Sequence, residues 1–210
     1  MNKEITYFDF EIRAENTEEH GKVLTGHPIV FGTEAKIFHP IRGQFIEIIE
    51  KGALADTDLR DVRFLVNHNT DMIPLARSRN NNANSTMQME VIEGKGMMIR
   101  VDLDTENNAD AKALYSAVER GDISGMSFMF SIDGYKWDDK ESDHPTRTVT
   151  KIGKVYEVSA VTFPAYEATS IQARGLADAL DSAKASLESA RAEAREIERK
   201  KHKIKLLMEV

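Results

Sequence analysis

Apolar residues at every second position dominate the first 104 residues of the chain. Near the N-terminus, Phe8, Phe10 and Ile12 share one face of an extended stretch, as expected of a half-buried β-strand. The same pattern predicts four more strands, at residues 23–31, 45–50, 62–66 and 96–103. Gly26 and Pro28 interrupt the first of these four, which indicates a bent strand or an edge strand.

One short helix is predicted after these strands. Capping residues occur between Thr105 and Asn108, and an alanine-rich stretch follows them. Gly121 is a suitable stop for this helix. We expect further strands at residues 123–135 and 148–163, the second broken at Gly153, an acidic loop at 138–143, and an exposed polar turn at 78–86. Many short strands with one or two helices predict an α+β chain, an antiparallel β-barrel or sandwich with helices packed on it.

The C-terminal region has a different pattern. Between Leu176 and Met208, apolar residues follow an alternating four-three spacing that only Lys201 breaks, and no Gly or Pro occurs after Gly175. This pattern predicts a long amphipathic helix with a narrow, alanine-rich apolar seam. The helix either folds back on the body or forms a weak coiled coil. We therefore divide the chain into a domain at residues 1–174 and a helical tail at 175–210.

Composition and charge exclude several classes of function. Of the 210 residues, 41% are hydrophobic and 30% are charged, as in globular chains, and no apolar run approaches the ~18 residues of a membrane span. The net charge of −7 argues against nucleic acid as the main partner. With no cysteine there is no thiolate nucleophile and no cysteine-based metal site, which fits a cytoplasmic setting. The chain also lacks glycine-rich phosphate loops and closely spaced histidine ligands, so we expect neither a cofactor nor a metal.

Three segments contain candidate catalytic residues. His68 directly follows an apolar strand and is flanked by asparagines, a position suited to proton transfer or, more simply, to a solvated loop. Ser124 and Ser127 lie where the predicted helix gives way to a strand, so either is a nucleophile or a buried hydroxyl. Glu157 interrupts an apolar strand, where a carboxylate needs a partner unless it points outward. The order His, Ser, Glu would suit a serine hydrolase.

Five sequence blocks, taken together, resemble the prohead (capsid maturation) protease family of tailed double-stranded-DNA phages. The resemblance covers about residues 26–170 and includes Leu75-Ala76-Arg77 after the third block. The blocks are GHPIVF at 26–31, FIEIIEKGAL at 45–54, VRFLVNHN at 62–69, GDISGMSF at 121–128 and YEVSAVTFPAY at 156–166. Two positions depart from the family pattern, since Met129 replaces a usual Gly and Leu54 a usual Phe. Both substitutions keep the strand apolar.

The resemblance implies a fold and roles for these residues. The fold would be a β-barrel wrapped by helices, as in the herpesvirus assemblins. His68 would be the general base, Ser127 the nucleophile, and Glu157 the residue that orients the imidazole. Ser124 remains the alternative nucleophile, although three residues along a strand place it on the opposite face. Arg77 would fix a loop or assist the oxyanion.

The implied function is a serine endopeptidase of prohead maturation. Its expected substrates are the scaffolding segment of the major capsid protein and the protease itself, inside the assembling prohead in the host cytoplasm. The expected partners are the capsid protein and the prohead shell, with possible self-association through the C-terminal helix and without nucleic acid or membrane. We expect the tail to act as a packaging or docking element that is shed during maturation.

Two other functions are compatible with the sequence. The first is a non-catalytic capsid-assembly scaffold or chaperone, which would be indifferent to Ser127→Ala. The second is a hydrolase of small esters, which is disfavoured because the chain has no GxSxG nucleophile elbow.

Overall fold

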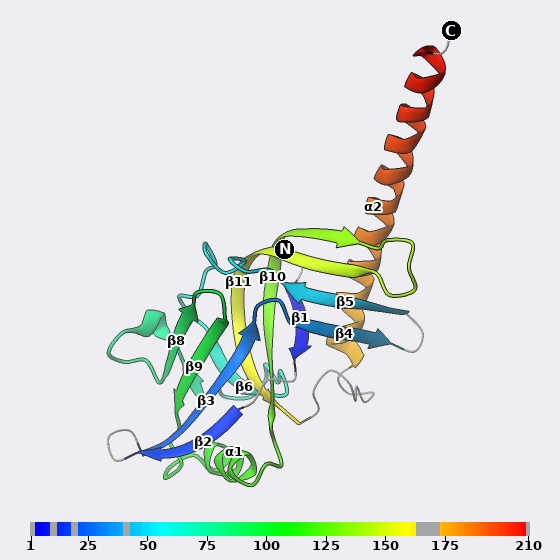
Figure 1. Cartoon of the computed structure of the whole chain (residues 1–210). Helices are drawn as coiled ribbons and strands as arrows, with labels where there is room; N and C mark the ends of the chain where they lie inside the picture. The colour runs from blue at the N-terminus through cyan, green and yellow to red at the C-terminus, as the bar shows by residue number, and fades with distance from the viewer. Residues whose placement is uncertain (1–2, 9–11, 18–20, 40–42, 163–172, 209–210) are drawn as a thin grey trace.

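A computed structural model of the chain describes residues 3–8, 12–17, 21–39, 43–162 and 173–208. These residues form two β-sheets, a short helix below them and a long C-terminal helix (Figure 1). In chain order the elements are β1 (Lys3–Phe8), β2 (Ile12–Thr17), β3 (Gly21–Val30), β4 (Glu34–His39), β5 (Gly43–Ile49), β6 (Arg63–Val66), β7 (Ala76–Arg77), the 3-10 helix η1 (Arg79–Asn81), β8 (Met87–Ile92), β9 (Gly96–Asp102), α1 (Ala109–Glu119), β10 (Gly125–Asp138), β11 (Thr146–Val161) and α2 (Ala173–Met208).

The larger sheet is built around the long antiparallel hairpin of β10 and β11. Its strand order is β1-β10-β11-β5-β4, and β6 pairs with β11 and with β7. On its edge away from β10, β11 pairs in parallel with β5 along its first part and in parallel with β6 along its last part. The second pairing places Val66 opposite Ala160, so the residues that follow β6 lie at the end of β11.

The smaller sheet is antiparallel, with the order β2-β3-β9-β8. A register shift in β3 between Gly26 and Ile29 confirms the predicted bend, although β3 lies between two strands and is not at an edge. The strand predicted to include Phe8 and Ile12 is two strands, β1 and β2, in different sheets. Phe10 lies outside the described residues. The alternation of apolar positions identified the extended stretch but not the change of sheet.

The two sheets and α1 enclose one apolar core. Its fully buried members come from both sheets, for example Leu24 and Ile99 from the smaller one and Phe128 and Phe130 from the larger one. The prediction of a closed β-barrel is wrong, because the described strands form two separate sheets, with β2 and β8 at the edges of the smaller one. The predicted α+β class, with mainly antiparallel pairing and a long C-terminal helix, is confirmed.

The predicted short helix is present as α1. The side chain of Asn108 caps it by accepting hydrogen bonds from the backbone N–H groups of Asp110 (2.9 Å) and Ala111 (3.2 Å). Gly121 follows the helix with φ of 79°, a backbone conformation that favours glycine. The polar turn at 78–86 is present but not wholly exposed. Ser78 is buried, and its hydroxyl accepts the N–H of Val62 at 2.9 Å.

The long helix α2 packs on the body only along part of its length. Ala183 and Leu187 are buried, and Trp137 Nε1 donates to the Ser186 hydroxyl at 3.0 Å. Figure 1 shows the later turns of α2 projecting away from the sheets, where Ile197 and Ile204 are 52% and 58% exposed. The side chains of residues 173–180 and 206–210 lie outside the described set. Among the described helices, none combines the length and apolar character needed to cross a membrane.

Candidate active site

His68 and Glu157 form a direct contact at the end of the larger sheet. After β6 ends at Val66, Asn67 and His68 have φ values of 51° and 55°, a left-handed turn that directs the chain back over β11. The Nδ1–H of His68 donates to Oε1 of Glu157 at 2.5 Å. Both side chains are nearly buried, with 6% and 3% of their surfaces exposed. The structure therefore brings together two of the residues singled out in the sequence.

Ser159 connects these two residues and was not predicted. Its hydroxyl donates to Oε2 of Glu157 at 2.5 Å and accepts the backbone N–H of His68 at 3.1 Å. Ser159 is fully buried, so both oxygens of the carboxylate accept hydrogen bonds away from water. The available signal was the spacing, because residues two apart on a strand share a face.

Ser127 lies on the next strand, opposite Ser159. The register of β10 and β11 pairs Ser127 with Ser159. Side chains paired across an antiparallel ladder lie on the same face, about 4.5–5.5 Å apart at Cβ. Ser127 is therefore on the face of Ser159 and Glu157, and it is fully buried. On its other side β10 pairs with β1, where Tyr7 is the partner of Ser127.

The second candidate serine is placed differently. Ser124 precedes β10 and is exposed, and its backbone carbonyl accepts the N–H of Ile12 at 3.2 Å. It is thus outside the ladder that joins Ser127 to Ser159. Of the two serines, Ser127 is the one that lies on the same sheet face as Ser159 and Glu157.

The left-handed turn that carries His68 is held by its neighbour. Asn67 exchanges two hydrogen bonds with Thr162, from Asn67 Nδ2 to the Thr162 hydroxyl (3.0 Å) and from the Thr162 N–H to Asn67 Oδ1 (2.9 Å). The Asn67 N–H also donates to the carbonyl of Ala160 at 2.9 Å. A positive φ at a residue other than glycine costs about 1–3 kcal/mol and persists only where other contacts enforce it. The hydrogen bonds of Asn67 with Thr162 and Ala160 hold the turn in this conformation.

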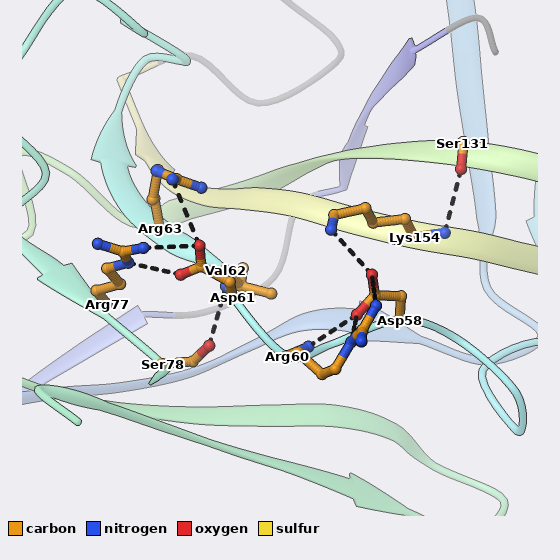
Figure 2. Close-up of polar contacts among 9 residues, drawn as sticks. All are labelled: Asp58, Arg60, Asp61, Val62, Arg63, Arg77, Ser78, Ser131 and Lys154. Carbon is orange, nitrogen blue, oxygen red and sulfur yellow. Dashed lines mark hydrogen bonds and ion pairs between the residues drawn. The ribbon is translucent and has the colours of Figure 1, made fainter. Parts of the chain in front are cut away.

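The segment before β6 is also tied to β11 (Figure 2). Asp58 receives hydrogen bonds from Arg60 (2.9 Å to Oδ1) and from Lys154 Nζ (2.9 Å to Oδ2), as drawn in Figure 2. The bonds from Arg60 and then from Lys154 hold the pKa of Asp58 well below its ordinary value. The backbone N–H of Asp58 donates to the carbonyl of Gly153 at 2.9 Å. The chain therefore enters β6 at a fixed position along β11.

Arg77 binds the same segment from β7. Its guanidinium donates two hydrogen bonds to Asp61, at 2.6 and 2.8 Å, and Arg63 lies on the same carboxylate (Figure 2). The bond from Arg77 lowers the pKa of Asp61, and Asp61 in turn raises the pKa of Arg77. Arg77 therefore has the contacts of a loop-fixing residue. A slip of one residue would turn β6 over and move His68 away from Glu157, so these anchors matter for the site.

The arrangement suits proton transfer at a hydroxyl. An ionised carboxylate can only accept hydrogen bonds, so its contact with Nδ1 of His68 favours the tautomer that has its proton on Nδ1 and its lone pair on Nε2. Within the described ranges, no three His, Asp or Glu side chains come together as a potential metal site.

Comparison with known proteins identifies a family that matches this chain. A family model described as the caudovirus prohead serine protease matches residues 8–182. No curated protein and no solved structure matches the chain, and the likeness to herpesvirus assemblins remains a prediction. The match includes β6, β10 and β11, the three strands that carry the candidate site. Because it covers well over half of the chain, this protein belongs to the caudovirus prohead serine protease family.

Proposed function

We propose that Ser127, His68 and Glu157 form the catalytic triad of this capsid-maturation protease. The observation that supports the proposal most directly is the 2.5 Å contact between His68 and Glu157, on the sheet face to which the register assigns Ser127. A base held by a buried acid beside a serine is the general arrangement of serine peptidases.

The reaction would be acyl transfer to water. The Ser127 hydroxyl attacks the carbonyl carbon of the scissile peptide while Nε2 of His68 takes its proton. Glu157 stabilises the resulting imidazolium through the bond to Nδ1. The imidazolium then protonates the leaving amine, the peptide C–N bond breaks, and an acyl-enzyme remains. A water molecule, deprotonated by His68, hydrolyses the ester and restores the serine.

The proposed substrates are the scaffolding segment of the major capsid protein and the protease itself, within the prohead in the host cytoplasm. The test is co-expression with the major capsid protein of the same phage, with intact mass as the readout. We compare wild type, Ser127→Ala and Ser124→Ala. The proposal expects a shortened capsid protein with wild type and Ser124→Ala, and an intact one with Ser127→Ala. Cleavage by Ser127→Ala would exclude it as the nucleophile, and normal shells without cleavage by any form would exclude the protease.

The projecting part of α2 is proposed as a docking element for an acidic partner. From Arg195 to Lys205 it contains six Arg or Lys residues and two Glu, whereas the whole chain has a net charge of −7. Two such helices would repel each other, which favours an acidic scaffold over self-association. The apolar residues Ile197 and Ile204, seven residues apart and exposed, supply the contact face.

A truncation separates docking from folding. A chain ending at Ala194 keeps the buried Ala183 and Leu187 and the bond from Arg191 Nε to the carbonyl of Lys140 (2.7 Å). We expect it to fold and to be packaged into proheads less efficiently than the full chain. Equal packaging would exclude the docking role. The division of the chain at residue 174 remains a prediction, which limited proteolysis of the full chain can test.

A further inference from the structure

A pocket of about 490 Å³ opens beside the loop that carries His68. It lies between this loop and α1, and it is lined by residues from three separate segments of the chain. The lining residues are Val66, Asn67, Asn69, Met72, Asp110, Ala113, Leu114, Ala117 and Ile123. Its volume is within the range of sites that hold small molecules.

The pocket is next to the loop that carries His68, and it includes a residue just before β10, the strand of Ser127. Asn67 and Asn69 flank His68 in the chain, and Ile123 lies four residues before Ser127. A substrate in extended conformation advances about 3.3 Å per residue, so a pocket beside the neighbours of His68 is within reach of substrate side chains a few residues from the scissile bond.

The floor of the pocket is apolar and its rim is polar. Three apolar lining residues are half-buried and pack against the hydrophobic core: Val66, Met72 and Ile123. Asn67, Asn69 and Asp110 are exposed. Asp110 is the only charged residue of the lining, and a single exposed carboxylate attracts a cation only weakly in water.

We propose that this pocket binds a large apolar side chain of the substrate, of the size of leucine or phenylalanine, close to the scissile bond. The inference rests on the proposed protease function and adds its specificity. The half-buried floor offers apolar surface to a side chain of that kind, and the exposed side chain of Asn69 on the rim can bind the substrate backbone. An apolar pocket of this type discriminates about 10- to 200-fold per methylene in kcat/KM.

The test fills the pocket from α1. Ala113 lines the pocket and is exposed, so Ala113→Phe places a ring in the cavity without disturbing the core. Lys112→Phe is the matched control, because it puts the same ring on an adjacent exposed position that does not line the pocket. Ala117→Leu, one turn further along α1, is a second filling variant should the first fail to fold.

Two readouts distinguish the pocket from the triad. Cleavage of a mixed peptide library, followed by mass spectrometry, should show a wild-type preference for a large apolar residue at one position near the cut. Ala113→Phe and Ala117→Leu should lower cleavage of those peptides at least tenfold, whereas Lys112→Phe should not. Labelling of Ser127 by a small fluorophosphonate, which does not need the pocket, should be the same in all forms.

The outcomes separate the two proposals. Normal labelling with no apolar preference in the wild type, or with a preference that the filling variants leave unchanged, would overturn the pocket and leave the triad. Neither labelling nor cleavage in any folded form would overturn the proposed function, and the pocket with it.

Discussion

Strand β11 carries a buried acid–base pair near each of its ends. Near its start, Arg147 lies opposite Glu47 of the parallel strand β5 and donates from Nε to Oε2 at 2.8 Å. Near its end, Glu157 accepts the Nδ1–H of His68, from the loop after the parallel strand β6. All four side chains are at most 6% exposed. The two pairs thus share a strand, a degree of burial and a parallel neighbour.

The two pairs differ in the base that contacts the carboxylate, which is an arginine in one and a histidine in the other. The guanidinium of an arginine is always protonated, so the pair of Arg147 and Glu47 can hold β5 against β11 but cannot exchange protons. The guanidinium carbon of Arg147 also lies 4.9 Å from the centre of the Phe45 ring, a further packing contact. An imidazole takes and gives a proton near neutral pH. A buried carboxylate is therefore no sign of catalysis in itself, and its partner decides what it can do.

The largest effect is expected when the exchangeable base is removed. His68→Gln keeps a side chain that can hydrogen-bond but has no basic nitrogen, so cleavage of the capsid protein should fall by about 10²–10⁴-fold. The stability of the fold should change little, because the amide N–H of the glutamine can still donate a hydrogen bond to Glu157. Cleavage rates and urea unfolding of the same preparation are the measurements. Near-normal cleavage would show that His68 is not the base.

The reverse result is expected for the permanently charged base. Arg147→Met leaves Glu47 buried without its cation, which should lower the free energy of unfolding by about 3–5 kcal/mol. Replacing both residues, as Glu47→Leu with Arg147→Met, should recover most of the loss because no uncompensated charge remains. Thermal and urea unfolding measure both. A single variant as stable as wild type would contradict a structural role for this pair.

A smaller effect is expected at Ser159. Ser159→Ala removes the hydroxyl shared by Glu157 and the backbone of His68, so the unfolding free energy should fall by about 1–3 kcal/mol. Cleavage should slow about tenfold, equivalent to about 1.4 kcal/mol, because the imidazole loses part of its support.

The matched control for Ser159 is on the neighbouring strand. Ser131 is also buried, and its hydroxyl accepts the N–H of Lys154 at 3.1 Å (Figure 2). Ser131→Ala should lower stability similarly and leave the cleavage rate per folded molecule unchanged. Equal slowing by both variants would reduce Ser159 to a packing residue.

The smallest effect on stability is expected at Asp58, whose contact with Lys154 of β11 is more exposed than the two buried pairs. Asp58 binds Lys154 and Arg60, and the latter is 78% exposed, so solvent screening limits the loss from Asp58→Asn to less than about 1 kcal/mol at pH 7. The pKa of Asp58 is lowered in the folded state, so its stabilisation is present above the unfolded pKa of about 4 and is lost as pH falls further. Urea unfolding at pH 7, 5 and 3 should show the two forms converging only at the lowest pH. A difference that grew on acidification would contradict this sign.

Sequence reasoning succeeded where structure is local. The apolar periods identified most strands, α1 with its Asn108 cap, and α2. Alternation shows which residues share a face but not which strand lies alongside, so the closed barrel was wrong and the split between β1 and β2 was missed.

The same limit applies to the site. His68 and Glu157 stood out as polar residues in apolar surroundings, whereas Ser159 is a small hydroxyl that strands commonly contain. The pocket comes from three segments of the chain, and no single one of them indicates it.

The parallel pairing of β6 with β11 determines when the candidate site can form during synthesis on the ribosome. His68 and Glu157 are 89 residues apart, and β11 is the last strand of the sheet to be synthesised. Contacts between distant parts of a chain form late in folding because a long loop must close first. While β11 is still inside the ribosome, the nascent chain contains His68 and Ser127 but has not yet exposed Glu157, the acid of the site. If the triad proposed above operates, proteolytic activity is acquired only after β11 has left the ribosome, with no separate inhibitor needed until then.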